Sequence, residues 1–225
     1  MAVDIQAYRR IASEARDHGA RLVAVSKTKP VSDILTLYHE GQRTFGENYV
    51  QELVAKQPAL PDDIAWHFIG HLQRNKVKYL APFISMIQTV DSLSLLGEID
   101  KQARKADRVI DCLIEVHIAR EDSKTGLDEQ GLLRLVEQFL GAPADYTHVR
   151  LRGLMGMASF TDDEEVVRKE FKKLRGLSEE VRRRFPALDA SFRELSMGMS
   201  ADYGWALEEG STLVRVGSLL FGARS

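Results

Sequence analysis

A pair of lysines follows a short apolar run near the start of the chain. In the segment LVAVSKTKP, the run Leu22 to Val25 predicts a buried strand, and Lys27 and Lys29 come directly after it. A lysine attacks an aldehyde only as the neutral amine, and partial burial favours that form because it penalises the ammonium. Lys27 is therefore a candidate for reversible covalent binding of a carbonyl compound. The alternative is that both lysines are ordinary solvated loop residues.

Two further segments place polar side chains after short apolar runs. In TFGENYVQE, Gly46 would let the backbone approach a ligand closely, and Asn48 offers both a donor and an acceptor. The alternative is that Asn48 only caps the following helix. In WHFIGHLQRNK, His67 and His71 flank the end of a run. Since no carboxylate or cysteine stands at metal-ligand spacing, we expect no metal site.

The best candidate for anion binding lies in residues 194–222. Ser196 and Ser200 follow one apolar run, and Gly217 and Ser218 follow the next, just after Arg215. Backbone N–H groups at the start of a helix bind phosphate well where glycine leaves them unobstructed. We expect a phosphate group to bind between these two segments, the alternative being a tight turn without a ligand.

Composition excludes several other classes of protein. The chain has 31 basic and 33 acidic residues, so its net charge of −2 favours neither a nucleic acid nor a membrane partner. Cys112 is the only cysteine, which excludes an internal disulfide framework and indicates a reducing compartment. The sequence contains no Walker-type run and no Ser/His/Asp order. The segment from Ser123 to Gly126 faces the same end as Lys27 or is a solvated turn.

Eight short β-branched or apolar runs alternate with amphipathic stretches. Several are continuously apolar, as expected of parallel strands covered on both faces. The runs are Leu22 to Ser26, Arg43 to Phe45, Trp66 to Ile69, Met86 to Val90, Cys112 to His117, Leu151 to Met155, Phe192 to Ser196 and Thr212 to Val216. This order predicts a single domain over residues 1–225 with a (β/α)8 barrel of the TIM type, in which binding residues follow the strands. A doubly wound open sheet is the alternative.

Helix signals separate the runs. Gly41, Gly141 and Gly210 follow periodic stretches where a left-handed residue ends a helix, and Pro186 ends the longest stretch. The segment 161–164 has the spacing of a capping box, which predicts that Thr161 and Glu164 begin that helix.

The N-terminal segment predicts a helix, since Ile5, Tyr8, Ile11 and Ala15 share one face and charges occur throughout. This pattern is unlike that of a signal peptide, and no window approaches the ~20 apolar residues of a membrane span. We therefore expect a cytoplasmic protein. The sequence ends about nine residues after the eighth run, so we expect no second domain.

Five segments taken together resemble the pyridoxal phosphate homeostasis proteins, the YggS or PROSC-type family. They are AVSKTKP, FGENYVQE, WHFIGHLQRNK, ELSMGMSAD and STLVRVGSLLFGAR. The resemblance spans residues 22–224 and is highly specific, because the five motifs keep the family's order and similar separations. It implies the barrel of the alanine racemase N-terminal domain, with pyridoxal 5′-phosphate (PLP) as the cofactor.

The resemblance also implies roles for individual residues. Lys27 would form the Schiff base with PLP, and Lys29 would be the neighbouring family lysine rather than the attachment point. Arg215 matches the arginine beside the pyridine nitrogen, and Asn48 would contact the phenolic oxygen of the cofactor.

By the same resemblance, three residues would hold the phosphate: Ser196, Gly217 and Ser218. Relatives often have threonine at the position of Ser218, and donation by the backbone N–H survives that change. His71 stands where some relatives have proline, with no expected effect on cofactor binding.

These implied roles favour binding over catalysis. A protonated pyridine ring draws electrons from a substrate's α-carbon, and a permanent cation at Arg215 disfavours that protonation. Alanine racemases combine a lysine with a tyrosine from an additional domain, which we do not expect here. We therefore predict a non-catalytic protein that buffers or delivers PLP in vitamin B6 homeostasis.

Two alternatives to this function stay open. The first is a minimal PLP-dependent amino-acid racemase, and the second is a regulatory module that senses PLP. For the carrier, PLP-dependent apoenzymes are the candidate recipients. We expect a monomer, with neither nucleic acid nor membrane as a partner.

Overall fold

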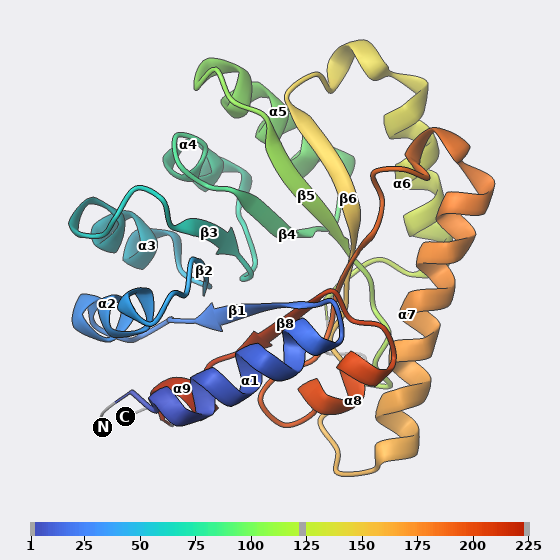
Figure 1. Ribbon diagram of the computed structural model, residues 1–225. Helices are drawn as coiled ribbons and strands as arrows, with labels where there is room; N and C mark the ends of the chain where they lie inside the picture. The colour runs from blue at the N-terminus through green and yellow to red at the C-terminus, as the bar shows by residue number, and fades with distance from the viewer. Residues whose placement is uncertain (1–2, 122–124, 223–225) are drawn as a thin grey trace.

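Eight parallel strands close into a barrel (Figure 1). The computed structural model describes residues 3–121 and 125–222. Each strand pairs with the next along the chain, and β1 pairs with β8 to close the barrel. The strands are β1 (Arg21–Val25), β2 (Thr44–Glu47), β3 (Ala65–Phe68), β4 (Met86–Val90), β5 (Ile110–Glu115), β6 (Val149–Met155), β7 (Glu194–Ser196) and β8 (Leu213–Val216). The predicted (β/α)8 barrel is confirmed, and the doubly wound open sheet is wrong.

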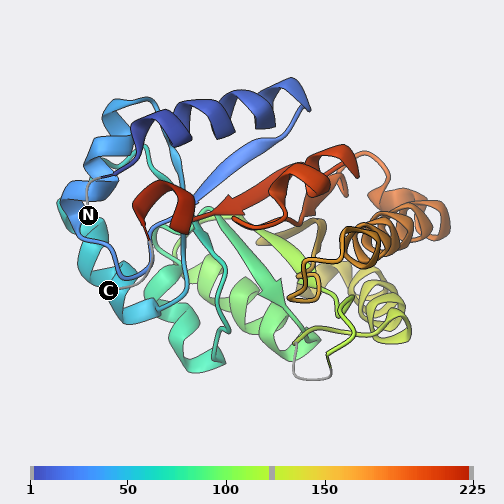
Figure 2. The same ribbon diagram turned by 90° about the horizontal axis from the view of Figure 1, so that it is seen from below.

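Helices surround the barrel (Figure 1, Figure 2). The α-helices are α1 (Ile5–Asp17), α2 (Val31–His39), α3 (Val50–Lys56), α4 (Val77–Leu80), α5 (Leu93–Lys105), α6 (Glu129–Gly141), α7 (Glu164–Arg184), α8 (Tyr203–Glu208) and α9 (Ser218–Phe221). Short 3-10 turns are η1 (Gln57–Ala59), η2 (Arg74–Lys76), η3 (Pro143–Asp145) and η4 (Pro186–Leu188). The first helix lies beside the last, and the Asp4 N–H donates to the Leu220 carbonyl at 2.8 Å. Two segments far apart in sequence thus cover the closure between β1 and β8.

Two hydrophobic cores lie on the two faces of the sheet. The larger core packs the strands against the helices and includes Leu22 and Ala24. The smaller one takes one side chain from each of five strands: Val23, Met86, Leu113, Met155 and Leu213. Because successive strand residues point to opposite faces, this smaller cluster fills the inside of the barrel. The polar residues that follow it along the strands therefore line the mouth.

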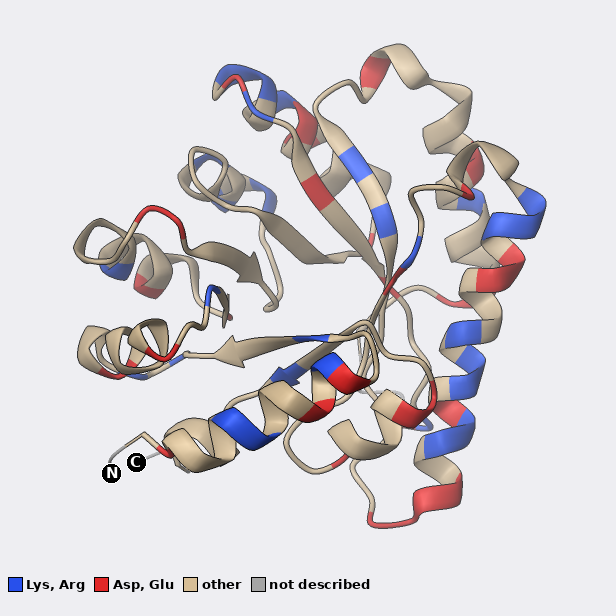
Figure 3. Cartoon of the chain, viewed as in Figure 1, with Lys and Arg blue, Asp and Glu red and all other residues tan. Residues whose placement is uncertain are grey.

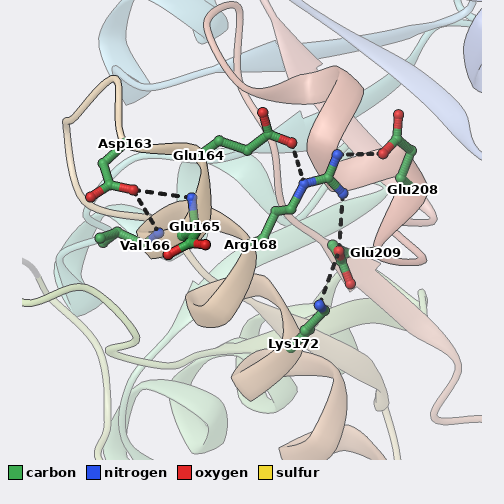
Figure 4. A network of polar contacts seen from close by, with 8 residues as sticks. All are labelled: Asp163, Glu164, Glu165, Val166, Arg168, Lys172, Glu208 and Glu209. Carbon is green, nitrogen blue, oxygen red and sulfur yellow. Dashed lines mark hydrogen bonds and ion pairs between the residues drawn. The ribbon is translucent and has the colours of Figure 1, made fainter.

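The predicted capping box of α7 is wrong. The N-cap is Asp163, whose carboxylate accepts from the N–H groups of Glu165 at 3.1 Å and Val166 at 3.3 Å (Figure 4). The Thr161 hydroxyl instead accepts from the Asp163 N–H. Asp163 takes the cap because it stands directly before the first helical residue, where a short carboxylate reaches both amides.

Glycine and proline end most helices as predicted. Gly41 and Gly210 have positive φ values of 101° and 91° just after α2 and α8. Pro186 follows the end of α7 and begins η4. Gly141 differs from its prediction, because it is the last residue of α6 and not a left-handed residue beyond it. The 3-10 turn that begins at Pro143 redirects the chain there.

Charged residues lie mostly on the helices and loops, and both signs are interspersed along α7 (Figure 3). Arg168 on α7 contacts three carboxylates, those of Glu164, Glu208 and Glu209, and Lys172 also reaches Glu209 (Figure 4). This network ties α7 to α8. Across the described residues, no helix has the length and apolar character needed to cross a membrane.

Candidate functional site

Four neighbouring strands carry the predicted site residues to one end of the barrel. Lys27 lies two residues beyond β1, Asn48 directly follows β2, Ser196 ends β7, and Gly217 directly follows β8. These strands are neighbours in the order β7, β8, β1, β2. Because all are parallel, their carboxyl ends share one rim. The predicted lysine, amide and phosphate-binding segments therefore meet at the same mouth.

Gly217 lies directly against the strand that precedes Lys27. A Cβ added to Gly217 would stand 3.1 Å from the Val25 carbonyl oxygen and 3.2 Å from the Val25 Cβ. The Gly217 N–H donates to the hydroxyl of Ser200 at 3.3 Å. Thus the hydroxyl beside this amide belongs to Ser200, in the loop after β7, while Ser218 is exposed at the first residue of α9.

Inside the barrel, polar side chains from four strands form one hydrogen-bonded row. Arg215 donates to the Ser196 hydroxyl at 2.6 Å and to the Gly156 carbonyl at 3.1 Å. Ser196 donates to Gln88 Oε1 at 2.6 Å, and the Gln88 amide reaches His67 Nδ1 at 2.9 Å. All four side chains of the row are buried. The row from Arg215 to His67, which we call the interior polar row, fixes the guanidinium of Arg215 in place.

Burial sets the charge along the interior polar row. It lowers the pKa of His67 to about 3, and the field of Arg21 acts in the same direction. The imidazole is therefore neutral near pH 7, so Nδ1 can accept from the Gln88 amide. Burial lowers the pKa of Arg215 to about 10, against the attraction of Asp202 and Glu115. The guanidinium still keeps its charge at neutral pH.

Asn48 has spare hydrogen-bonding capacity at the mouth. Its Oδ1 is buried and has no partner among the described residues. The N-cap of α3 is Tyr49, without a side-chain cap, so the alternative capping role of Asn48 is wrong. A Cβ on Gly70 would stand 2.3 Å from the Asn48 carbonyl oxygen, so only glycine lets the two loops approach this closely.

The two lysines after β1 differ in their surroundings. Lys27 is partly buried, next to the fully buried Ser26. Lys29 donates from Nζ to the Phe221 carbonyl at the end of α9, at 2.9 Å. Lys29 thus links the loop after β1 to the last helix, α9, and it is not a solvated loop lysine.

A buried carboxyl group that sequence reasoning missed lies at the end of β5. Glu115 is 4% exposed and accepts from the Thr125 hydroxyl at 2.5 Å. Burial raises the pKa of Glu115, and the nearby Asp91 charge adds to this effect, whereas Thr125, Arg215 and His71 oppose it. The loop after β5 is therefore anchored to the mouth by Thr125, although Ser123 and Lys124 lie outside the described residues.

Gln88 was also missed by sequence reasoning, and the sequence holds the same clue to Gln88 and to Glu115. Each is a polar residue within a mostly apolar strand run, MIQTV for Gln88 and IDCLIE for Glu115. His71 is exposed while His67 is buried. In the described ranges, no group of three or more metal-ligating side chains gathers.

Comparison with known proteins agrees with this geometry. The family model of the alanine racemase N-terminal domain matches residues 4–225. A pyridoxal phosphate homeostasis protein of Aquifex aeolicus is 43% identical over 206 residues, which is 91% of this chain and 87% of that protein. The chain belongs to the pyridoxal phosphate homeostasis protein family.

A further relative and two solved structures agree with this assignment. The human member is 39% identical over 236 residues, covering 99% of this chain and 84% of its own. PipY of Synechococcus elongatus, solved without PLP, superimposes with a TM-score of 0.88 at 34% identity, covering 96% of this chain and 99% of PipY. PipY solved with PLP bound gives a TM-score of 0.83 at 35% identity, covering 96% and 100%. The family resemblance of the five sequence segments is confirmed.

Proposed function

We propose that this protein holds PLP as a Schiff base on Lys27 and maintains the intracellular PLP supply without catalysing amino-acid chemistry. The observation that carries the proposal is the contact of Gly217 with Val25 across β8 and β1. It brings the start of α9 next to the strand that leads to Lys27. One small ligand with both an aldehyde and a phosphate could therefore contact both segments.

The mouth fits PLP in three respects. The Gly217 amide, unobstructed by a side chain and beside the Ser200 hydroxyl, suits a phosphate oxygen. The Oδ1 of Asn48, which no described residue contacts by a hydrogen bond, suits a phenolic hydroxyl donor. Arg215 supplies a fixed cation from β8. In this proposal the phosphate is held by the backbone amides of Gly217 and Ser218 and by the Ser200 hydroxyl, whereas Ser196, whose hydroxyl already donates to Gln88, acts by holding Arg215.

Arg215 favours binding and delivery of PLP over PLP-dependent catalysis. PLP supplies an electron sink whose strength depends on protonation of the pyridine nitrogen. Arg215 is cationic and held by Ser196 and Gly156, so it cannot turn away from a ring placed beside it. A second positive charge there is disfavoured. The relatives' names, which refer to PLP homeostasis, are consistent with this reading. The proposal includes a cytoplasmic monomer that delivers PLP to apoenzymes.

Borohydride reduction tests the attachment site. Purified protein incubated with PLP, reduced, digested and examined by mass spectrometry should carry a pyridoxyl group on the peptide that contains Lys27. Lys27→Ala should abolish the Schiff-base absorbance, since no other amine is proposed to condense with the aldehyde. Lys29→Ala is the matched control and should retain it. An adduct that persists in Lys27→Ala would refute the assignment.

A minimal amino-acid racemase is the second candidate, and Glu115 is the observation that favours it. A buried carboxyl with a raised pKa at the mouth is a proton-holding group of the kind a racemase requires besides its lysine. Incubation of the PLP-loaded protein with a single-enantiomer amino acid in deuterated water decides between the two. We expect no deuterium at Cα on the timescale of enzymatic turnover. Rapid exchange would establish the enzyme instead.

A further inference from the structure

A second buried polar cluster lies behind Lys27, on the outer face of the sheet. Lys56, the last residue of α3, is 8% exposed, and its ammonium group donates three hydrogen bonds. The acceptors are Glu47 Oε1 at 2.9 Å, Glu52 Oε1 at 2.5 Å and the Ser26 carbonyl at 2.9 Å. An ammonium has three N–H donors, so Lys56 is fully satisfied.

This cluster holds both peptide groups that flank the Cα of Lys27. On the N-terminal side, Lys56 holds the Ser26 carbonyl. On the C-terminal side, the Thr28 N–H donates to Glu52 Oε1 at 2.5 Å. A residue has only two soft backbone dihedrals, and each is set by the peptide group on its own side. Holding both peptide groups therefore fixes the direction of the Cα–Cβ bond of Lys27.

Two further observations indicate that the local backbone is constrained. Thr28 has a φ of 64°, in the left-handed region that a β-branched residue rarely adopts. This conformation accompanies the contact of the Thr28 N–H with Glu52. Ser26 is also held through its side chain, which donates to Glu47 Oε1 at 2.7 Å. Strained backbone of this kind persists only where the surroundings impose it.

We propose that Glu52 and Lys56 are positioning residues that aim the side chain of Lys27 at the ligand's aldehyde. Neither residue is proposed to touch the ligand. This inference rests on the proposed function, because it requires Lys27 to be the amine that condenses. It adds that Schiff-base formation depends on α3, whereas binding of the phosphate does not.

Glu52 is the better position to change. Removing Lys56 would leave Glu47, which is 0% exposed, without its cation, and the protein could fail to fold. The side chain of Glu52 is 22% exposed, and its replacement leaves Lys56 and Glu47 paired with each other. Glu52→Leu removes the acceptor for the Thr28 N–H, while Glu52→Gln keeps an acceptor of the same length. Lys101→Met, which breaks an exposed ion pair with Glu98 on α5, serves as the matched control.

The experiment compares two probes on each variant. PLP reports phosphate binding and Schiff-base formation together, and pyridoxine 5′-phosphate, which lacks the aldehyde, reports phosphate binding alone. We expect Glu52→Leu to weaken PLP binding and slow Schiff-base formation about tenfold or more, since small displacements of a reacting group are costly. It should bind pyridoxine 5′-phosphate as the native protein does. Glu52→Gln should recover most of the PLP binding, and Lys101→Met should match the native protein.

Two outcomes would overturn the inference. Equal weakening of both probes by Glu52→Leu would mean that Glu52 only supports the fold, and unchanged PLP binding would mean that it has no role. Lys27→Ala, measured in parallel, separates this result from the proposed function. Loss of the Schiff base in Lys27→Ala together with normal PLP binding by Glu52→Leu rejects the positioning role alone. A Schiff base that survives in Lys27→Ala rejects the attachment site itself.

Discussion

Replacing Ser196 by alanine tests whether its hydroxyl stabilises the interior polar row or binds the phosphate. The hydroxyl is fully buried and accepts from Arg215 while donating to Gln88, both at 2.6 Å. Its removal leaves a charged donor and an amide oxygen unpaired inside the barrel. The first costs about 1.5–3 kcal/mol and the second about 1–2 kcal/mol, so the free energy of unfolding of the ligand-free protein should fall by about 2.5–5 kcal/mol. At about 2–4 °C per kcal/mol for a domain of this size, Tm should fall by about 5–20 °C.

Ser200→Ala is the matched comparison. Ser200 is only partly buried, and its hydroxyl accepts from the Gly217 N–H at 3.3 Å. We expect a loss of stability within about 1 kcal/mol for the ligand-free protein. Its PLP affinity should fall by about tenfold or more, because a hydrogen bond to a charged phosphate is worth about 1.5–3 kcal/mol.

Thermal unfolding of the ligand-free variants and equilibrium dialysis against PLP measure the two effects separately. Ser196→Ala should be the less stable variant. Ser200→Ala should lose PLP affinity with little loss of stability. The reasoning fails if ligand-free Ser196→Ala unfolds at the native Tm while its PLP affinity falls more than that of Ser200→Ala. The Ser196 hydroxyl would then serve the phosphate rather than the interior polar row.

Two further predictions concern the same mouth. Because the pKa of His67 lies at about 3 in the folded protein and at the ordinary value of 6.5 in the unfolded chain, the unfolded chain binds the proton first as pH falls. The free energy of unfolding should therefore begin to fall near pH 6.5, and its slope should approach about 1.4 kcal/mol per pH unit between pH 5.5 and 4.5. His67→Gln should remove that part of the slope in urea titrations. Gly70→Ala should displace Asn48, whose carbonyl oxygen lies 2.3 Å from the added Cβ, and so weaken PLP binding with an intact circular dichroism spectrum; unchanged affinity would argue against a role for Asn48.

The eight strands could be predicted from the sequence because parallel barrel strands are buried on both faces. Continuous apolar runs follow directly from that burial, and each run begins and ends within two residues of a strand. Caps were less predictable, since Asp163 and Thr161 both have the right chemistry and the path of the chain decides between them.

The site was predictable only in part. Lys27 and Gly217 follow strands, and Arg215 lies one residue before the end of β8, so their location at the functional end of a barrel could be inferred. The partners of Arg215 could not, because the interior polar row joins Ser196 to Gln88, a residue 108 positions away. Contacts at such separations depend on the closed barrel, and no local pattern encodes them.

The pairing of β1 with β8 has a consequence for synthesis of the protein. Lys27 follows β1 and Gly217 follows β8, so the edge of β1 has no partner on that side until β8 has been made. At about 5–20 residues per second, β8 leaves the ribosome roughly 10–40 s after β1. Under the proposed function, a nascent chain therefore carries the Lys27 amine before the amides at the start of α9 exist. We expect ribosome-bound fragments that stop before β8 to leave the PLP aldehyde free.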